Sequence, residues 1–455
     1  MKKFKLSYYS VITDIINEEE LEPKRIIYST RSSKVLTIKD KTYGHIINGE
    51  LEKLDNNDLF NLTDALLIVP EDEDEFNVIL NENSSGLKDR KILYHVMQPG
   101  ANCQLGCHYC GQKHTKDSLS ENLYETIINR IEGKIITKEF DYENLDFTWY
   151  GGEPLMALKQ IRELTPMLKS LAKKHNLSYT ADMITNGLSL KENLFVELVE
   201  KLNILSFQIT IDGTAEIHDK RRMTKTGENT FSLIMKNIVN CVNNTIYKEK
   251  KCSIGIRINI DKTNQENVNI LLEHLETLNI LDKVNVQFAQ IVDWGKNGAS
   301  ANSLNDNDFA ENEIGWMLKL IQSGGKTSDF IPVRVNAACM VEDKNSEVFD
   351  AFGNVFPCYE LPYTPIYEDS EWLIGNLKNP DKEFKTDNSL RNWVDHVKEA
   401  TVSDCKSCKF YPVCGGGCPK SWLEGKPACP SFKFNIEDRL ILQYISNSSS
   451  IKELL

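Results

Sequence analysis

The sequence predicts an α/β protein whose central part is a partial parallel barrel of six βα units. Two observations support this fold class: β-rich runs alternate with helical segments over residues 89–325, and Cys, Gly and Pro gather after them. Repeated βα units form a parallel sheet with helices outside. A chain of 455 residues, 41% of them hydrophobic, is long enough for several cores. We expect an α+β module at 1–88, the barrel at 89–325, a cysteine-rich domain at 326–440 and a helical tail at 441–455.

The first 88 residues predict a small module of their own. Two β-rich runs, 26–29 and 34–38, flank Arg31-Ser32-Ser33 and predict a hairpin. Apolar spacing then predicts helices at 43–54 and 57–65, and the acidic run 71–75 predicts a solvated turn.

The central region supplies the barrel elements. Strands are predicted at 92–97, 145–150, 178–185, 204–211, 253–260 and 284–290. Helices are predicted at 123–137, 158–175, 194–202 and 231–242, with one more at 311–323 and a closing helix at 432–455. In such a barrel the loops at the carboxyl ends of the strands build the active site.

Charge and hydropathy exclude several classes of protein. A net charge of −13 disfavours nucleic-acid binding, which rests on clustered Lys and Arg. No apolar run approaches the roughly 20 residues that span a bilayer, and the N-terminus lacks the apolar core of a secretory signal. We therefore expect a cytoplasmic protein without a membrane partner. In that compartment, 12 cysteines favour metal binding or chemistry over disulfides.

Three cysteines lie on one short loop after the first predicted barrel strand. Cys103, Cys107 and Cys110 have the spacing C-x3-C-x2-C. Three thiolates can hold three irons of a four-iron cluster and leave the fourth iron open, whereas four are usual in a cluster that only carries electrons. The alternative is a zinc site completed by His108 or His114, although structural zinc normally has four close protein ligands.

This loop, with Tyr109 before its last cysteine, closely resembles the radical S-adenosylmethionine (SAM) superfamily. The resemblance implies that the open iron chelates the amino and carboxylate groups of SAM. It also implies that an electron from the cluster cleaves SAM to a 5'-deoxyadenosyl radical, which abstracts hydrogen from a C–H bond. Cys103, Cys107 and Cys110 would then form the catalytic centre, with a low-potential donor such as flavodoxin or ferredoxin as electron source.

Further family motifs follow in the same order as the strands. Gly151-Gly152-Glu153-Pro154 is similar to the GGEP motif that holds the SAM amino group, and Thr185-Asn186-Gly187 to a ribose-contacting turn. The run from Gln208 to Asp212 resembles the fourth strand of the family. Arg222 resembles the Arg that pairs with the SAM carboxylate, a bidentate contact that suits a guanidinium. The remaining candidates are Arg221 as its substitute and Arg257 and Asn259 facing the nucleoside.

The later cysteines reproduce the seven-position pattern of the SPASM extension found in radical SAM peptide-modifying enzymes. By resemblance, four would bind an outer auxiliary cluster: Cys405, Cys408, Cys414 and Cys429. Three would hold an inner cluster nearer the SAM site: Cys339, Cys358 and Cys418. The inner cluster lacks a fourth cysteine because residues 330–338 contain none. The resemblance thus implies SAM and three [4Fe-4S] clusters, against the alternative of zinc knuckles.

Two cysteines, Cys241 and Cys252, fall outside every pattern and are predicted to be buried core thiols. The N-terminal module resembles the winged-helix-like domains that recognise the leader of a precursor peptide by adding it as a strand. A plain structural cap is the alternative for that module.

The leading prediction is therefore a radical SAM maturase that forms a thioether or carbon-carbon crosslink in a ribosomally synthesised precursor peptide with a leader. One alternative is an anaerobic sulfatase-maturing enzyme, which makes formylglycine; those relatives place an Asp after the cysteine that here is Cys358, where this chain has Tyr359 and Glu360. Epimerisation and decarboxylation also stay open. The alternative of another class is a non-catalytic iron-sulfur carrier or peptide-binding scaffold. Candidates for a general base are Glu360, Asp212 and Tyr359.

Overall fold

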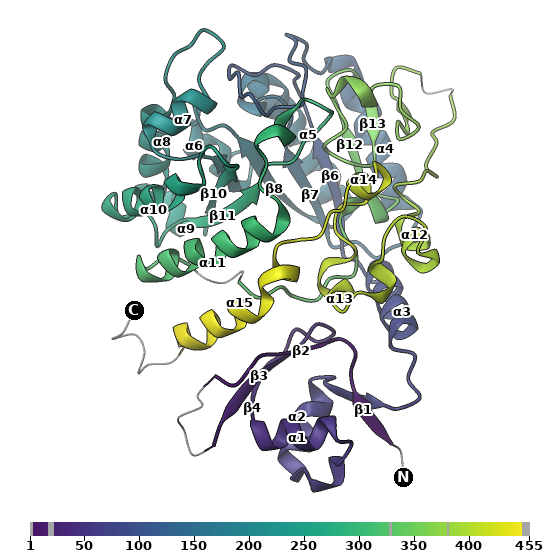
Figure 1. Cartoon of the computed structure of the whole chain (residues 1–455). Helices are drawn as coiled ribbons and strands as arrows, with labels where there is room; N and C mark the ends of the chain where they lie inside the picture. Colours follow the sequence, from purple (N-terminus) through teal and green to yellow (C-terminus); the bar gives the residue numbers. More distant parts are fainter. Residues whose placement is uncertain (1–2, 17–21, 327–329, 380–381, 448–455) are drawn as a thin grey trace. The chain divides into compact units, whose positions relative to one another are not determined.

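The chain divides into two compact units that do not follow the sequence order. A computed structural model describes residues 3–16, 22–326, 330–379 and 382–447 (Figure 1). Unit 1 consists of Met1–Lys88, Thr327–Glu342 and Asn392–Leu455, and unit 2 of Asp89–Lys326 and Asp343–Arg391. The cysteine-rich region is thus shared: its middle part belongs with the barrel strands, and its two ends belong with the N-terminal module.

A mostly parallel sheet of nine strands forms the centre of unit 2. Six strands are parallel neighbours in chain order: β6 (Ile92–Met97), β7 (Asn144–Trp149), β8 (Ser178–Thr185), β9 (Ile204–Thr210), β10 (Ser253–Ile260) and β11 (Asn285–Gln290). Three more extend the sheet beyond β6: β12 (Glu347–Phe349), β13 (Asn354–Phe356) and β14 (Gly375–Asn376). The mixed α/β fold class with its βα barrel strands is therefore confirmed.

Helices cover one face of this sheet (Figure 1). They are α4 (Tyr124–Ile136), α5 (Leu158–Lys174), α6 (Glu192–Glu200), α7 (Ala215–Arg221), α8 (Phe231–Asn243), α9 (Thr245–Glu249), α10 (Val268–Thr277) and α11 (Asp306–Gln322). Aromatic side chains such as Phe147, Phe195 and Phe207 are fully buried. Helix α11 begins five residues before the predicted start, because the Asn305 side chain caps it by accepting from Asp308 N.

The opposite face of the same strands is polar. Thr148, Asp182 and Ser206 are neighbours on β7, β8 and β9, and Gln208 lies two residues further along β9. They alternate with the buried apolar residues because successive strand residues point to opposite faces. Polar side chains therefore line the interior of the partial barrel, as a polar ligand would require.

The N-terminal part of unit 1 contains the predicted hairpin. Its elements are β1 (Phe4–Leu6), β2 (Ser10–Ile12), β3 (Lys24–Ser29), β4 (Val35–Lys39), α1 (Asp40–Ile47), α2 (Asn56–Asp64), β5 (Ile68–Pro70) and α3 (Glu75–Lys88). Strands β2, β3 and β4 form an antiparallel sheet. The predicted helix 43–54 is wrong in extent: α1 ends at Ile47, and Gly49 turns the chain with a φ of 72°. The acidic run is a turn only in part, because Glu75 is buried and accepts from Tyr8 N at 3.1 Å.

The C-terminal part of unit 1 is built mainly of helices. They are α12 (Trp393–Glu399), α13 (Tyr411–Cys414), α14 (Pro419–Leu423) and α15 (Phe432–Asn447). Helix α15 begins where the closing helix was predicted, and residues 448–455 of the expected tail lie outside the described residues. Among the described helices, none is long and apolar enough to cross a membrane.

Candidate iron-sulfur and cofactor site

The loop after β6 brings the first three cysteines together. Cys110 N donates to Cys107 O at 3.2 Å, which closes the turn between these residues. Burial, followed by the charge of Glu153 and the smaller effects of Cys107 and Cys110, raises the pKa of the Cys103 thiol to about 12. Burial also raises the pKa of Cys107 to about 11. Such thiols stay protonated at neutral pH unless a cation or metal binds the thiolate, so this donor set fits a bound iron cluster.

A single metal ion has no ready-made site in the described residues. No group of three or more His, Cys, Asp or Glu side chains there has the arrangement that would hold one ion. The fit to a cluster rests on the chemistry of the three thiols and on the neighbours of their loop.

The turn after β7 lies directly against the cysteine loop. Gly152 N donates to Gln112 Oε1 at 3.0 Å, and Glu153 N donates to Asn102 O at 2.7 Å. Gly151 and Gly152 have φ values of 80° and 50°, and a side chain on Gly152 would collide with the carbonyl of Asn102. Glycine is therefore required here by conformation and by space.

Glu153 links the loops of two strands. Its carboxylate is fully buried and accepts from Thr185 Oγ1 at 2.7 Å, Asn186 N at 2.7 Å and Leu155 N at 3.0 Å. Burial raises the pKa of this carboxyl. A carboxylate offers about four acceptor positions, so one remains for a further donor. Pro154 is buried in the short 3-10 helix that follows.

Tyr109 is held in place by residues from three other parts of the barrel. Its hydroxyl donates to Asp212 Oδ2 at 2.6 Å and accepts from Arg222 Nη1 at 2.6 Å and Asn259 Nδ2 at 3.2 Å. Asp212 is fully buried and also accepts from Asn259 N at 3.2 Å. These bonds favour a positioning role for Asp212 over a role as general base.

The two neighbouring arginines differ in their partners. Arg221 Nη1 donates to both carboxylate oxygens of Asp261, at 2.9 and 3.0 Å. Arg222 is 7% exposed, and its Nε has no hydrogen-bond partner among the described residues. Burial lowers the pKa of Arg222, but Cys107, Tyr109 and Asp212 together raise it well above its usual value. A buried donor without a partner costs roughly 1–3 kcal/mol, so Arg222 is the arginine with a donor available for a ligand.

Other predicted residues of unit 2 fall into two groups. Gln208 is half-buried on the polar face, and Arg257 Nε donates to Asn259 Oδ1 at 2.9 Å. Cys241 and Cys252 are buried, and their sulfurs lie 3.9 Å from the carbonyls of Leu190 and Ile246. The prediction of core thiols is confirmed.

The turn that carries Cys358 is fastened beside the first cysteine loop. Gln98, the residue after β6, donates through Nε2 to Tyr359 O at 2.7 Å, and its own carbonyl accepts from Tyr363 Oη at 2.7 Å. Lys113 N, three residues after Cys110, donates to Tyr363 O at 2.6 Å. These contacts were not predictable from the motifs, because they join segments far apart in the chain.

In unit 1 four cysteines line one pocket. They are Cys405, Cys408, Cys414 and Cys429. Tyr411, Trp422 and Lys433 are among the other residues that line it, and Lys433 Nζ donates to Cys429 Sγ at 3.2 Å. This donor set fits a fully cysteine-bound cluster. Of the other three predicted ligands, Cys339 and Cys418 belong to unit 1 and Cys358 to unit 2.

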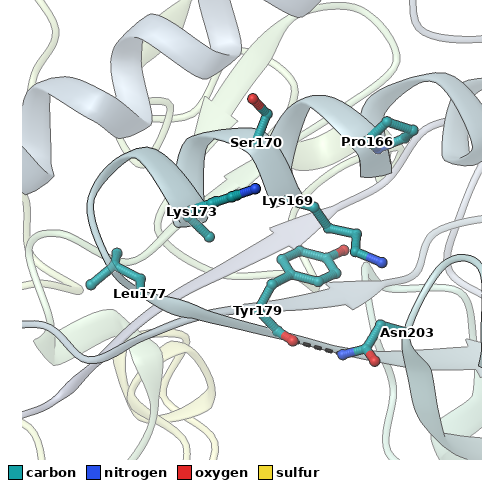
Figure 2. Close-up of a pocket in the computed structure, with 8 residues that line it drawn as sticks. Pro166, Lys169, Ser170, Lys173, Leu177, Tyr179 and Asn203 are labelled. Atoms are coloured by element: carbon teal, nitrogen blue, oxygen red, sulfur yellow. Dashed lines mark hydrogen bonds between the residues drawn. The ribbon is translucent and has the colours of Figure 1, made fainter.

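Another pocket lies on the outer side of unit 2, between α5 and the start of β8. It is lined by Pro166, Lys169, Ser170, Ala172, Lys173, Leu177, Tyr179 and Asn203 (Figure 2). Asn203 Nδ2 donates to Tyr179 O at 2.7 Å at its edge (Figure 2). None of the predicted site residues lines it.

Comparison with known proteins agrees with the fold of unit 2. Residues 97–272 match the Radical SAM superfamily. The chain is 24% identical over 398 residues to the cysteine-type anaerobic sulfatase-maturating enzyme of Clostridium novyi (strain NT), covering 80% of this chain and 100% of that protein. It is 24% identical over 370 residues to the serine-type enzyme of Bacteroides thetaiotaomicron, covering 73% and 83%.

A solved structure shares the fold. The structure of anSMEcpe with bound AdoMet (SAM) and Cp18Cys peptide covers 78% of this chain and 97% of its own, at a TM-score of 0.54 and 20% identity. The fold and the family match together assign residues 97–272 to the radical SAM class of domains. This chain carries a Radical SAM superfamily domain at residues 97–272, and that family implies SAM and a [4Fe-4S] cluster as cofactors.

Proposed function

We propose that this protein modifies a precursor peptide by radical SAM chemistry, forming a thioether or carbon-carbon crosslink. The main support for a SAM site is that two buried side chains near the cysteine loop have hydrogen-bonding capacity left. One offers an acceptor and the other a donor. The Glu153 carboxylate has an acceptor position left, and the buried Arg222 Nε has no partner among the described residues. The amino-acid end of SAM offers a matching ammonium and carboxylate.

The chain's own residues have separate tasks in this proposal. Cys103, Cys107 and Cys110 would hold the cluster, and Arg222 and Glu153 would orient SAM on it. Gly152 allows the second loop to approach, and the Tyr109 network fixes the loop from the other side. When bound, the cluster and SAM supply the radical that abstracts hydrogen.

The peptide substrate is supported by the second cysteine set and the N-terminal module. Crosslinking requires loss of one electron after the new bond forms, and an oxidised auxiliary cluster is a suitable acceptor. Cys358, a proposed inner-cluster ligand, lies on a turn that is bonded to the end of β6 and to the segment after Cys110. Within unit 2, Cys358 is therefore close in space to the first cysteine loop.

Sulfatase maturation is the second candidate, favoured by the two relatives above. Tyr359 and Glu360 after Cys358 differ from the Asp expected of that activity. In the crosslinking proposal Glu360 is the candidate base, because the neighbouring Tyr359 and Tyr363 are bonded through their carbonyls to Gln98 and Lys113, on either side of the first cysteine loop.

The test is anaerobic reconstitution with iron and sulfide, followed by reduction and measurement of 5'-deoxyadenosine. A non-catalytic carrier makes none. The reconstituted protein is then incubated with short peptides encoded beside its gene and, separately, with a sulfatase peptide that contains Cys or Ser. A crosslink removes a pair of hydrogen atoms without creating an aldehyde, whereas formylglycine is an aldehyde that reacts with a hydrazide probe. If only formylglycine forms, sulfatase maturation replaces crosslinking as the proposed function.

A further inference from the structure

The N-terminal sheet is covered on both faces within unit 1. On one face, Ile27 of β3 packs with Leu62 and Ile68 of its own module. On the other face, Ile26 and Tyr28 pack in a second apolar cluster with the C-terminal residues Phe410, Val413, Ile436 and Leu440. Alternate residues of one strand thus serve two cores. Without the C-terminal segment, an apolar face of the module would be exposed to water.

Polar contacts join the same module to the backbone beside two cysteines. Thr30 is fully buried, and its hydroxyl lies 2.6 Å from Lys409 O, its nearer acceptor, and 3.0 Å from Tyr9 O. The Tyr8 hydroxyl donates to Ser407 O at 2.5 Å. These two carbonyls lie on either side of Cys408 in the chain.

The neighbouring Cys405 is part of a third apolar cluster. It packs with Tyr9 and Ile79 of the module and with Trp393 and Tyr411 of the C-terminal segment. Cys405, Cys408 and Tyr411 also line the four-cysteine pocket. The module therefore contacts the outer side of the pocket wall through both apolar and hydrogen-bonding groups.

We infer that the N-terminal module is a structural wall of the outer cysteine site, which holds the Cys405–Cys408 loop in the conformation that binds the auxiliary cluster. This role is separate from peptide recognition, and it rests on the proposed function because that function places a cluster in this pocket. Thr30 and Tyr8 are positioning residues, since they act through the backbone of the loop.

The experiment compares two valine variants of the full-length, anaerobically reconstituted protein. Thr30→Val removes the hydroxyl that holds Lys409 O. The matched control is Thr42→Val, which removes another buried hydroxyl of the same module, bonded to Asp58 Oδ2 at 2.9 Å. Each protein is exposed to an iron chelator, alkylated at timed intervals, and digested for mass spectrometry of each cysteine.

In Thr30→Val we expect Cys405, Cys408, Cys414 and Cys429 to become alkylated roughly two- to tenfold faster than in the wild type, the effect of one lost hydrogen bond. Cys103, Cys107 and Cys110 should keep their wild-type rates, and Thr42→Val should match the wild type at both sets.

Equal rates in Thr30→Val and Thr42→Val would overturn the inference, as would a uniform acceleration at all cysteines. If Thr30→Val does not fold, Tyr8→Phe provides the same comparison, because Tyr8 is 53% exposed and the change removes only the hydroxyl that donates to Ser407 O. If the four outer cysteines of the wild type are never protected while Cys103, Cys107 and Cys110 are, the auxiliary cluster itself is absent and the inference is wrong for that reason.

Discussion

The Glu153 carboxylate and the backbone N–H of Asn186, 2.7 Å apart, join the loops that follow the second and third barrel strands. The same carboxylate accepts from the Thr185 hydroxyl. One buried acidic side chain therefore sets the distance between two loops that face the cysteine cluster.

Glu153→Gln should weaken SAM binding while the fold survives. The amide places a donor where Thr185 or Asn186 also donates, which costs about 1–3 kcal/mol, and it removes the charge that would attract the SAM ammonium. We expect SAM affinity and 5'-deoxyadenosine production to fall at least tenfold, measured by equilibrium binding and single-turnover assay. Unchanged SAM affinity would show that Glu153 only joins the loops.

Arg222→Gln and Arg221→Gln should have different effects. Arg222 has a spare donor, so its loss should mainly raise the dissociation constant for SAM, by tenfold or more. Arg221→Gln leaves the carboxylate of Asp261 buried without its cation, which costs about 3–5 kcal/mol of unfolding free energy. Urea denaturation and SAM titration separate the two. If Arg221→Gln instead weakened SAM binding and Arg222→Gln lowered the unfolding free energy, Arg221 would be the residue that binds SAM.

Gly152→Ala should prevent cluster assembly. The new methyl group would collide with the Asn102 carbonyl, in a backbone conformation that disfavours side chains. Gly227→Ala is the matched control, because Gly227 has a φ of 91° but nothing within 4 Å of an added Cβ. Iron content after reconstitution should fall in the first variant and stay at wild-type level in the second.

Cys358→Ala should abolish peptide product while SAM cleavage continues. The reason is that Cys358 is a proposed inner-cluster ligand and lies outside the Cys103–Cys110 loop. Cys252→Ala, at a buried core thiol, serves as the control and should retain both activities. Loss of SAM cleavage in Cys358→Ala, at wild-type occupancy of the first cluster, would contradict the separation of the two roles.

Stability should decrease as the pH falls below 6.5, in part because of His95. Burial, and then the charge of Lys134, lowers the pKa of His95 from 6.5 to about 3. The unfolded chain therefore binds a proton that the folded chain does not. Between pH 7 and pH 5, the protonation of this one group in the unfolded chain lowers the free energy of unfolding by about 2 kcal/mol. His95→Asn, whose amide oxygen can replace Nδ1 as acceptor for Glu347 N, should remove that part of the pH dependence. Urea unfolding of the wild type and His95→Asn at pH 7 and pH 5 measures the change in unfolding free energy. An equal change in both proteins would contradict the role given to His95.

The sequence by itself determined the elements of the barrel and the identity of the cysteine motifs. Strand and helix positions follow from local apolar periodicity, so β6, β8 and β10 have their predicted bounds. The spacing of Cys103, Cys107 and Cys110 is also local, because three ligands on one short loop need no distant contact to lie close together.

Only the tertiary structure decided between residues that look alike in sequence. Arg221 and Arg222 are adjacent, and what separates them is that Asp261, forty residues further along, neutralises the first. The strands and helices of the N-terminal module were also predicted from local patterns. Only the structure shows that Phe410 and Leu440 cover the second face of β3. The physical reason is the same in both cases. Burial and ion pairing depend on groups that are distant in the chain, and local sequence patterns do not predict which of these groups come into contact.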